Sequence, residues 1–255
     1  MKQIIDELRL TAADLFPSRH ERRMVLGVIS LTVVISISEL LLAHFFSLLI
    51  LPNNPRATND LLLLGLLFLL LFSVMKVINF GKEHFRLSIF EKSLDQNQTT
   101  SQASDSWKWA TAMELTSLMA MGGRLFFISV LLFFFSPVFG LCNLIVGLAI
   151  FQVLSLRYRN QYRSQREFRV KQKQKQPVSN SEKVRTRIIA GEIGSLISSA
   201  GLILLLGVLL LLYAKGNIDA AKAFVLFIAV RMVGQIYSGF SSGLMRFARA
   251  RVLSE

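Results

Sequence analysis

The sequence has 255 residues, of which 53% are hydrophobic, and its mean hydropathy is +0.50. An ordinary soluble domain of this length is much less apolar, so composition excludes that class and favours a membrane protein. In a membrane protein, the net charge of +13 reflects basic residues that determine topology and attract anionic lipid. We therefore do not expect it to form a nucleic-acid-binding surface. The single cysteine, Cys142, excludes an intrachain disulfide framework, and nothing in the sequence indicates a zinc site or a redox function.

The N-terminal residues 1–17 predict a short amphipathic helix. Apolar side chains recur there at helical spacing beside charged ones, so we expect an elbow helix that lies in the membrane interface. Ser18 and Glu21 follow Pro17 in the pattern of a capping box, which predicts the start of the first long helix.

Six apolar stretches follow, and most are long enough to cross about 30 Å of hydrocarbon. The third is short but extends backward through residues 113–123, and Ser136 and Pro137 predict a tight turn between the third and the fourth. We therefore predict an all-α membrane protein with six transmembrane helices in residues 18–255. The stretches are residues 24–51, 61–80, 125–135, 138–156, 196–213 and 220–245.

Local signals predict that several helices are longer than the membrane requires. Residues 82–91 continue the second span as an amphipathic helix, and no breaker interrupts the fourth helix between Pro137 and Pro177. A second capping box at residues 179–182 predicts the start of the fifth helix. We expect two helical hairpins in the cytoplasm, at about residues 81–123 and 157–192.

Basic residues predict the orientation, because cytoplasmic loops hold an excess of lysine and arginine. All but five of the 29 lysines and arginines lie on one predicted side, and the five are Arg56, Arg124, Lys215, Lys222 and Arg231. We expect a multi-pass protein of the plasma (cell inner) membrane with both termini in the cytoplasm.

Glu39 and Arg231 are charged residues near the middle of the first and sixth spans, and charges at that depth are costly unless they are paired or face water. We predict an ion pair between them, which is either a structural clamp or a site of substrate contact or gating. Gln152 and Gln235, with Asn143 and His44, are candidates for polar lining of the same cavity, and each alternatively forms a hydrogen bond between helices.

Gly239 and Gly243 form a Gly-x-x-x-Gly pattern on the sixth helix, which predicts close helix packing, either inside the chain or across a homodimer. Arg124 and Lys76 lie close enough to the inner interface for their side chains to reach it, so we assign them no role in transport.

Three segments together resemble the transmembrane domain of an ABC exporter, most closely those that flip lipid-linked saccharides. They are residues 18–50 with their basic entry and Glu39, residues 126–163 with the Ser-Pro turn, and residues 216–254, which open with Gly-Asn-Ile-Asp-Ala-Ala-Lys-Ala-Phe. The resemblance implies a six-helix unit that forms a homodimer or a paralogue heterodimer, exchanges its fourth and fifth helices with the partner, and rests on ATPase domains.

The sequence departs from that family in having no Gly-x-x-x-x-Gly-Lys-Ser/Thr loop for phosphates. We therefore expect no nucleotide-binding domain, no enzymatic activity and no cofactor in this chain, with ATP used only through a separate nucleotide-binding subunit. The resemblance makes Trp107, Lys108 and Trp109, near the first hairpin, candidates for coupling to that subunit.

Two functions fit these expectations. The first is the permease subunit of a split ABC-type exporter, which moves an amphipathic or lipid-linked substrate. The alternative is a structural, assembly or regulatory membrane scaffold without an ATPase. A proton-driven carrier ranks third, because Glu39 is the only acidic residue deep in a span.

Overall fold

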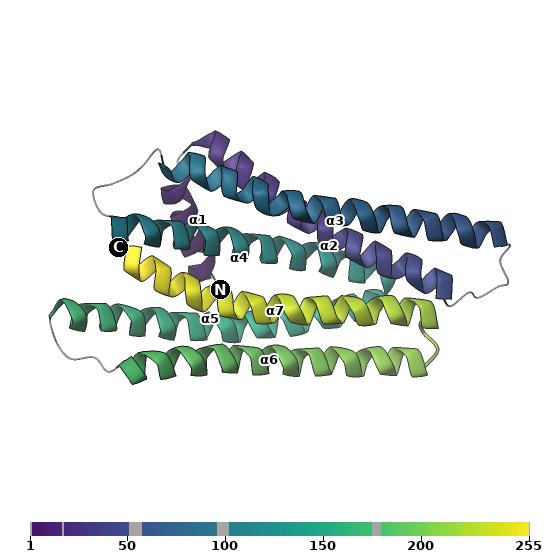
Figure 1. The fold of residues 1–255 in the computed structure, drawn as a ribbon. Coiled ribbons are helices and arrows are strands. Elements are labelled where there is room, and N and C mark those ends of the chain that lie inside the picture. Colours follow the sequence, from purple (N-terminus) through teal and green to yellow (C-terminus); the bar gives the residue numbers. More distant parts are fainter. Residues whose placement is uncertain (1, 17, 51–57, 96–101, 175–179, 255) are drawn as a thin grey trace.

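A computed structural model of the chain describes residues 2–16, 18–50, 58–95, 102–174 and 180–254. Over these ranges the chain is almost entirely helical, with one short transverse helix and six long helices that lie side by side (Figure 1). The helices are α1 (Lys2–Leu15), α2 (Arg19–Ile50), α3 (Thr58–Asp95), α4 (Gln102–Phe135), α5 (Pro137–Lys173), α6 (Asn180–Ala214) and α7 (Ala220–Ser254).

Each helix from α2 to α7 contains a segment that is long and apolar enough to cross a membrane. The predicted all-α fold with six membrane-capable helices is therefore confirmed for the described residues. The short third stretch is part of the continuous helix α4, as its backward extension predicted.

Several helices are longer than a membrane crossing needs. α3 has 38 residues and α5 has 37, which correspond to about 55 Å at 1.5 Å per residue, against about 30 Å of hydrocarbon. Residues 81–95, 102–123, 157–173 and 180–192 of the predicted hairpins are helical and belong to α3, α4, α5 and α6. The second predicted capping box begins at Ser179, which lies outside the described residues, as do residues 96–101.

Hydrogen bonds at two helix starts match the sequence signals. The Ser18 amide donates to Glu21 Oε2 at 3.2 Å and the Glu21 amide donates to Ser18 Oγ at 3.1 Å, so the predicted capping box is confirmed. At the α4–α5 turn, the Gly140 amide donates to the Ser136 carbonyl at 2.8 Å, and α5 begins at Pro137. A proline suits this first helical position because it has no amide hydrogen and none is needed there.

The turn between α6 and α7 is equally short. Gly216 adopts φ of 70°, a left-handed conformation that glycine reaches without steric cost. The Lys222 amide donates to Asp219 Oδ1 at 2.9 Å, which caps α7. This turn fixes where α7 enters the bundle.

Helix α1 lies across one end of the bundle, where the C-terminus also lies (Figure 1). Phe16 at its end is only 2% exposed and belongs to the main hydrophobic core. Arg251 near the end of α7 lies 3.3 Å from the Asp14 carboxylate. The predicted amphipathic elbow is therefore a helix that packs on the bundle, and it places both termini toward one end.

Helix α7 occupies the centre of the bundle and contacts α2, α4, α5 and α6. Its buried apolar face, which includes Val225, Leu226 and Leu244, forms a large part of the main core. α3 is peripheral, because it packs chiefly on α2 through a small cluster around Ile35, Leu42 and Met75. Most of the other side chains of α3 between residues 62 and 80 are apolar and exposed, as lipid contact requires.

Candidate functional site

Although α7 is central, one of its faces is polar and largely open. Arg231, Gln235, Ser238, Arg246 and Arg249 are exposed and Ser242 is half-buried. Their spacing of three and four residues places all six on one side of the helix. We call this row the α7 stripe. It runs from the middle of the apolar segment to the end of the bundle that holds the termini.

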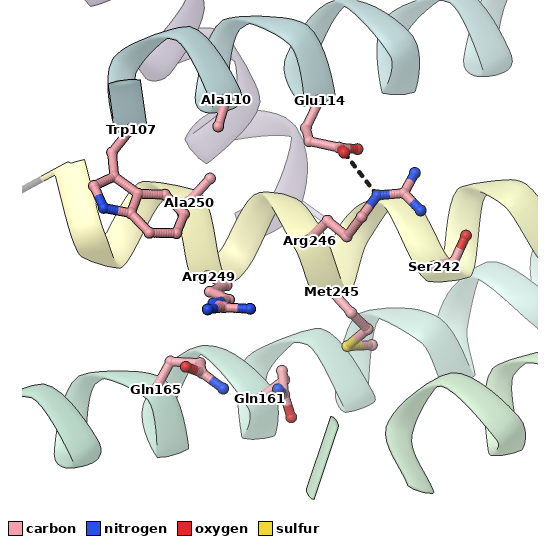
Figure 2. Close-up of a pocket in the computed structure, with 10 residues that line it drawn as sticks. All are labelled: Trp107, Ala110, Glu114, Gln161, Gln165, Ser242, Met245, Arg246, Arg249 and Ala250. Atoms are coloured by element: carbon pink, nitrogen blue, oxygen red, sulfur yellow. Dashed lines mark hydrogen bonds and ion pairs between the residues drawn. The ribbon is translucent and has the colours of Figure 1, made fainter. Parts of the chain in front are cut away.

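The end of the stripe nearest the C-terminus opens into a pocket of about 360 Å³ between α4, α5 and α7 (Figure 2). We call it the α7 pocket. Its polar groups are Glu114 of α4, Gln161 and Gln165 of α5, and Ser242, Arg246 and Arg249 of α7, while Trp107 and Met245 supply aromatic and apolar surface. Gln161 is only 4% exposed.

Two interactions hold the cations of this pocket. Arg246 Nε donates to Glu114 Oε1 at 2.6 Å, which joins α7 to α4 (Figure 2). The Arg249 guanidinium lies 5.6 Å from the centre of the Trp107 ring, within the range of a cation–π interaction. The second carboxylate oxygen, Glu114 Oε2, is buried and accepts no hydrogen bond from the described residues. The pocket therefore combines aromatic surface, two guanidinium groups and a buried acceptor, which suits an amphipathic ligand with a polar head.

Arg231 lies at the other end of the stripe. It is eleven residues from the first residue of α7, or about 16 Å along the helix, which is half of a hydrocarbon thickness. Its side chain is exposed and forms no ion pair with the described residues. A cation at this depth is not stable against lipid alone, so this face requires water or a polar partner.

The predicted ion pair between Glu39 and Arg231 is wrong for the chain by itself. Glu39 instead lies 3.9 Å from the Arg124 guanidinium, and Arg124 Nε donates to Ser36 Oγ at 2.5 Å. Helix counting places the two residues at equal depth, but within the described residues Glu39 pairs with a residue of α4 and not with Arg231. Arg124, for which no role in transport was predicted, thus links α4 to α2 through Glu39 and Ser36.

The other predicted lining residues take different positions. Gln235 belongs to the α7 stripe, but Gln152 is exposed on α5 and does not line the α7 pocket. Asn143 is buried and donates to Ser129 Oγ at 3.0 Å. It therefore forms a hydrogen bond between α5 and α4, which was the alternative predicted for it. His44 packs beside the Phe135 ring, with 5.8 Å between ring centres.

The candidate coupling residues Trp107, Lys108 and Trp109 are half-buried near the start of α4. Trp107 lines the α7 pocket, and Trp109 packs against the main core. Gly239 and Gly243 both approach α4 of the same chain, next to Met121 and Leu118 respectively. The two glycines therefore pack inside the chain, which is one of the two alternatives predicted for the Gly-x-x-x-Gly pattern.

The sequence matches no protein-family model, and no curated protein matches it. The groups of the α7 stripe and the α7 pocket are therefore the basis for a functional proposal. In the described part of the chain, no group of three or more His, Cys, Asp and Glu side chains is placed to hold a metal ion.

Proposed function

We propose that this chain is the membrane-spanning permease subunit of a split ABC-type exporter, which moves an amphipathic or lipid-linked substrate with a separate ATPase subunit. The observation that carries the proposal is the α7 stripe, because a polar row that reaches Arg231 at membrane depth needs a polar surface opposite it. A second copy of the chain, or a paralogue, supplies that surface if the two stripes face one central cavity.

The α7 pocket lies at one end of this cavity and receives the polar head of the substrate. Arg246 and Arg249 attract an anionic head, while Trp107 and Met245 contact the apolar part. Arg231 and Gln235 extend the polar path toward the middle of the membrane. Alternate opening of the two ends then moves the head across without exposing it to hydrocarbon.

The ATPase acts from the end of the bundle where α3, α4 and α5 extend past the membrane. Those extensions carry much of the basic excess, which supports a cytoplasmic position by the positive-inside rule. Trp107, Lys108 and Trp109 lie near the start of α4 and are the candidates for transmitting movement to the membrane helices. Of these, Lys108 is the residue that neither lines the α7 pocket nor packs against the main core.

The test is purification of the tagged chain in mild detergent, with mass spectrometry of its companions and an ATPase assay. We expect a nucleotide-binding subunit to copurify, with ATP turnover that Lys108→Glu reduces. Lys215→Glu is the matched control, because it makes the same charge change at the opposite end of the bundle. A homodimer without ATPase activity contradicts the exporter proposal and leaves the membrane scaffold as the function to pursue.

A further inference from the structure

The α7 pocket contains hydrogen-bond acceptors that no described residue uses. Arg246 donates to Glu114 Oε1, but the buried Glu114 Oε2 accepts no hydrogen bond from the described residues. Gln161 is only 4% exposed, and within the described part of the chain neither its amide nor that of Gln165 forms a hydrogen bond. Buried polar groups normally have a hydrogen-bond partner. These acceptors therefore indicate a ligand that donates hydrogen bonds.

The polar groups of the α7 pocket differ in how far they are buried. Gln161 is almost completely buried and the Glu114 side chain is 21% exposed, whereas the Arg246 side chain is 56% exposed and Arg249 is also exposed. The acceptors thus line the inner part of the pocket, and the guanidinium groups lie at its mouth. A ligand with a hydrogen-bond donor at its tip and an anionic group behind the tip matches this order.

The size and level of the α7 pocket indicate a lipid headgroup. Its volume of about 360 Å³ is at the lower end for a small-molecule site, so it holds a headgroup and not a whole lipid. Glu114 is 21 residues from the last residue of α4 and Arg246 is 26 residues from the first residue of α7, or about 32 Å and 39 Å along the helices. Both values lie between the thickness of the hydrocarbon, about 30 Å, and that of the bilayer with its headgroups, about 40–45 Å.

A primary ammonium suits the inner acceptors better than a choline group does. It has three N–H donors, and the inner part of the pocket offers three acceptor groups, on Glu114, Gln161 and Gln165. A quaternary choline nitrogen has no N–H donor and is bound chiefly by aromatic faces. The Trp107 ring already has the Arg249 guanidinium 5.6 Å from its centre. The pocket therefore fits ethanolamine and leaves choline without its usual partner.

We propose that the α7 pocket binds the headgroup of phosphatidylethanolamine. The ammonium donates to Glu114, Gln161 and Gln165 in the inner part of the pocket. Arg246 and Arg249 donate to the phosphate oxygens at its mouth. This inference names the substrate class of the proposed exporter and rests on that function, in which the α7 pocket receives the substrate head.

Native mass spectrometry of the purified chain with phosphatidylethanolamine, phosphatidylcholine or phosphatidylglycerol tests the proposal. We expect phosphatidylethanolamine to bind about tenfold more tightly than phosphatidylcholine, because choline leaves the buried acceptors unpaired. Glu114→Gln should weaken phosphatidylethanolamine binding about tenfold through loss of the charged acceptor. Phosphatidylglycerol has no ammonium and should be retained by this variant, which shows that the pocket is intact.

Two further variants examine the amide groups. Gln161→Leu should weaken phosphatidylethanolamine relative to phosphatidylglycerol, and Gln152→Leu is the matched control, because Gln152 is exposed on the same helix outside the α7 pocket. Gln165→Glu adds a carboxylate and should increase the preference for phosphatidylethanolamine over phosphatidylglycerol. Arg249→Gln removes a phosphate donor and should weaken both lipids.

Equal binding of phosphatidylethanolamine and phosphatidylcholine would overturn the proposal, as would an unchanged preference over phosphatidylglycerol in both Glu114→Gln and Gln165→Glu. Glycerophosphoethanolamine has the same head without acyl chains, and its binding as tightly as the lipid would overturn a lipid as the ligand. The copurification experiment separates this proposal from the proposed function. Loss of lipid preference with a copurified nucleotide-binding subunit would overturn the headgroup alone, whereas the expected preference without such a subunit would support the headgroup and contradict the exporter.

Discussion

Glu114 and Arg246 interact across the α7 pocket, and their environments differ. The Glu114 side chain is 21% exposed and that of Arg246 is 56% exposed, at a distance of 2.6 Å. Removal of the cation leaves the less exposed carboxylate without its donor, whereas removal of both charges leaves neither group unpaired.

We therefore expect Arg246→Gln to lower the free energy of unfolding by about 1 kcal/mol, the upper end for a pair with one exposed partner. Glu114→Gln together with Arg246→Gln should restore part of this loss. A double-mutant cycle in detergent, with unfolding followed by circular dichroism, measures the coupling. A coupling of zero would mean that the pair does not join α4 to α7 energetically.

The charged residues also indicate how far sequence reasoning reaches. Counting along the helices predicted similar depth for Glu39 and Arg231, and each lies eleven residues from the nearer end of its helix. The depth of a residue does not determine which neighbouring helix its side chain faces, however. The neighbour of Glu39 depends on how α4 packs on α2. Arg124 reaches Glu39 for that reason. The α7 stripe follows helical spacing in the sequence, but of its six residues only Arg231 and Gln235 were predicted to line a site.

At the scale of helices, the α4–α5 turn depends on one close approach. A Cβ atom on Gly140 would lie 2.8 Å from Phe133 Cα, and a backbone atom cannot move aside as a flexible side chain can. We expect Gly140→Ala to destabilise the protein by about 1–3 kcal/mol through overpacking. Gly207→Ala in α6 is the control, because nothing lies within 4 Å of its new Cβ atom. Equal unfolding free energies of the two variants would contradict this packing.

The helical elements were more predictable than the site because their signals are local. The capping box at Ser18 and the break at Pro137 act over a few residues, and both occur where the sequence placed them. The α7 pocket and the pocket lined by Lys82, Arg86 and Arg124 each combine residues from three different helices. Their composition depends on helix rotation, which apolar periodicity alone does not determine for helices that are apolar on most faces.

For the whole molecule, the distribution of basic residues predicts one orientation. Asn217 lies in the α6–α7 turn, whereas Arg163 lies on the extended part of α5. In a Cys142→Ser background, we expect Asn217→Cys to react with an impermeant maleimide on intact cells, and Arg163→Cys to react only after lysis. The reverse pattern would place the termini outside and contradict the proposed position of the ATPase.

The final prediction concerns the surroundings of the α7 stripe in the assembled protein. A thiol reacts as its thiolate, which forms in water and not in hydrocarbon. Gln235→Cys and Ser238→Cys, each with Cys142→Ser, should therefore react with a hydrophilic maleimide much faster than Leu204→Cys on the apolar surface of α6. Leu204 is 62% exposed in the chain by itself, so accessibility within the chain does not distinguish it from the stripe.

Faster reaction at the stripe would support a cavity between subunits. Equal slow reaction, without a crosslink between the two cysteines of a homodimer, would mean that lipid covers the stripe, and Arg231 would then require another partner.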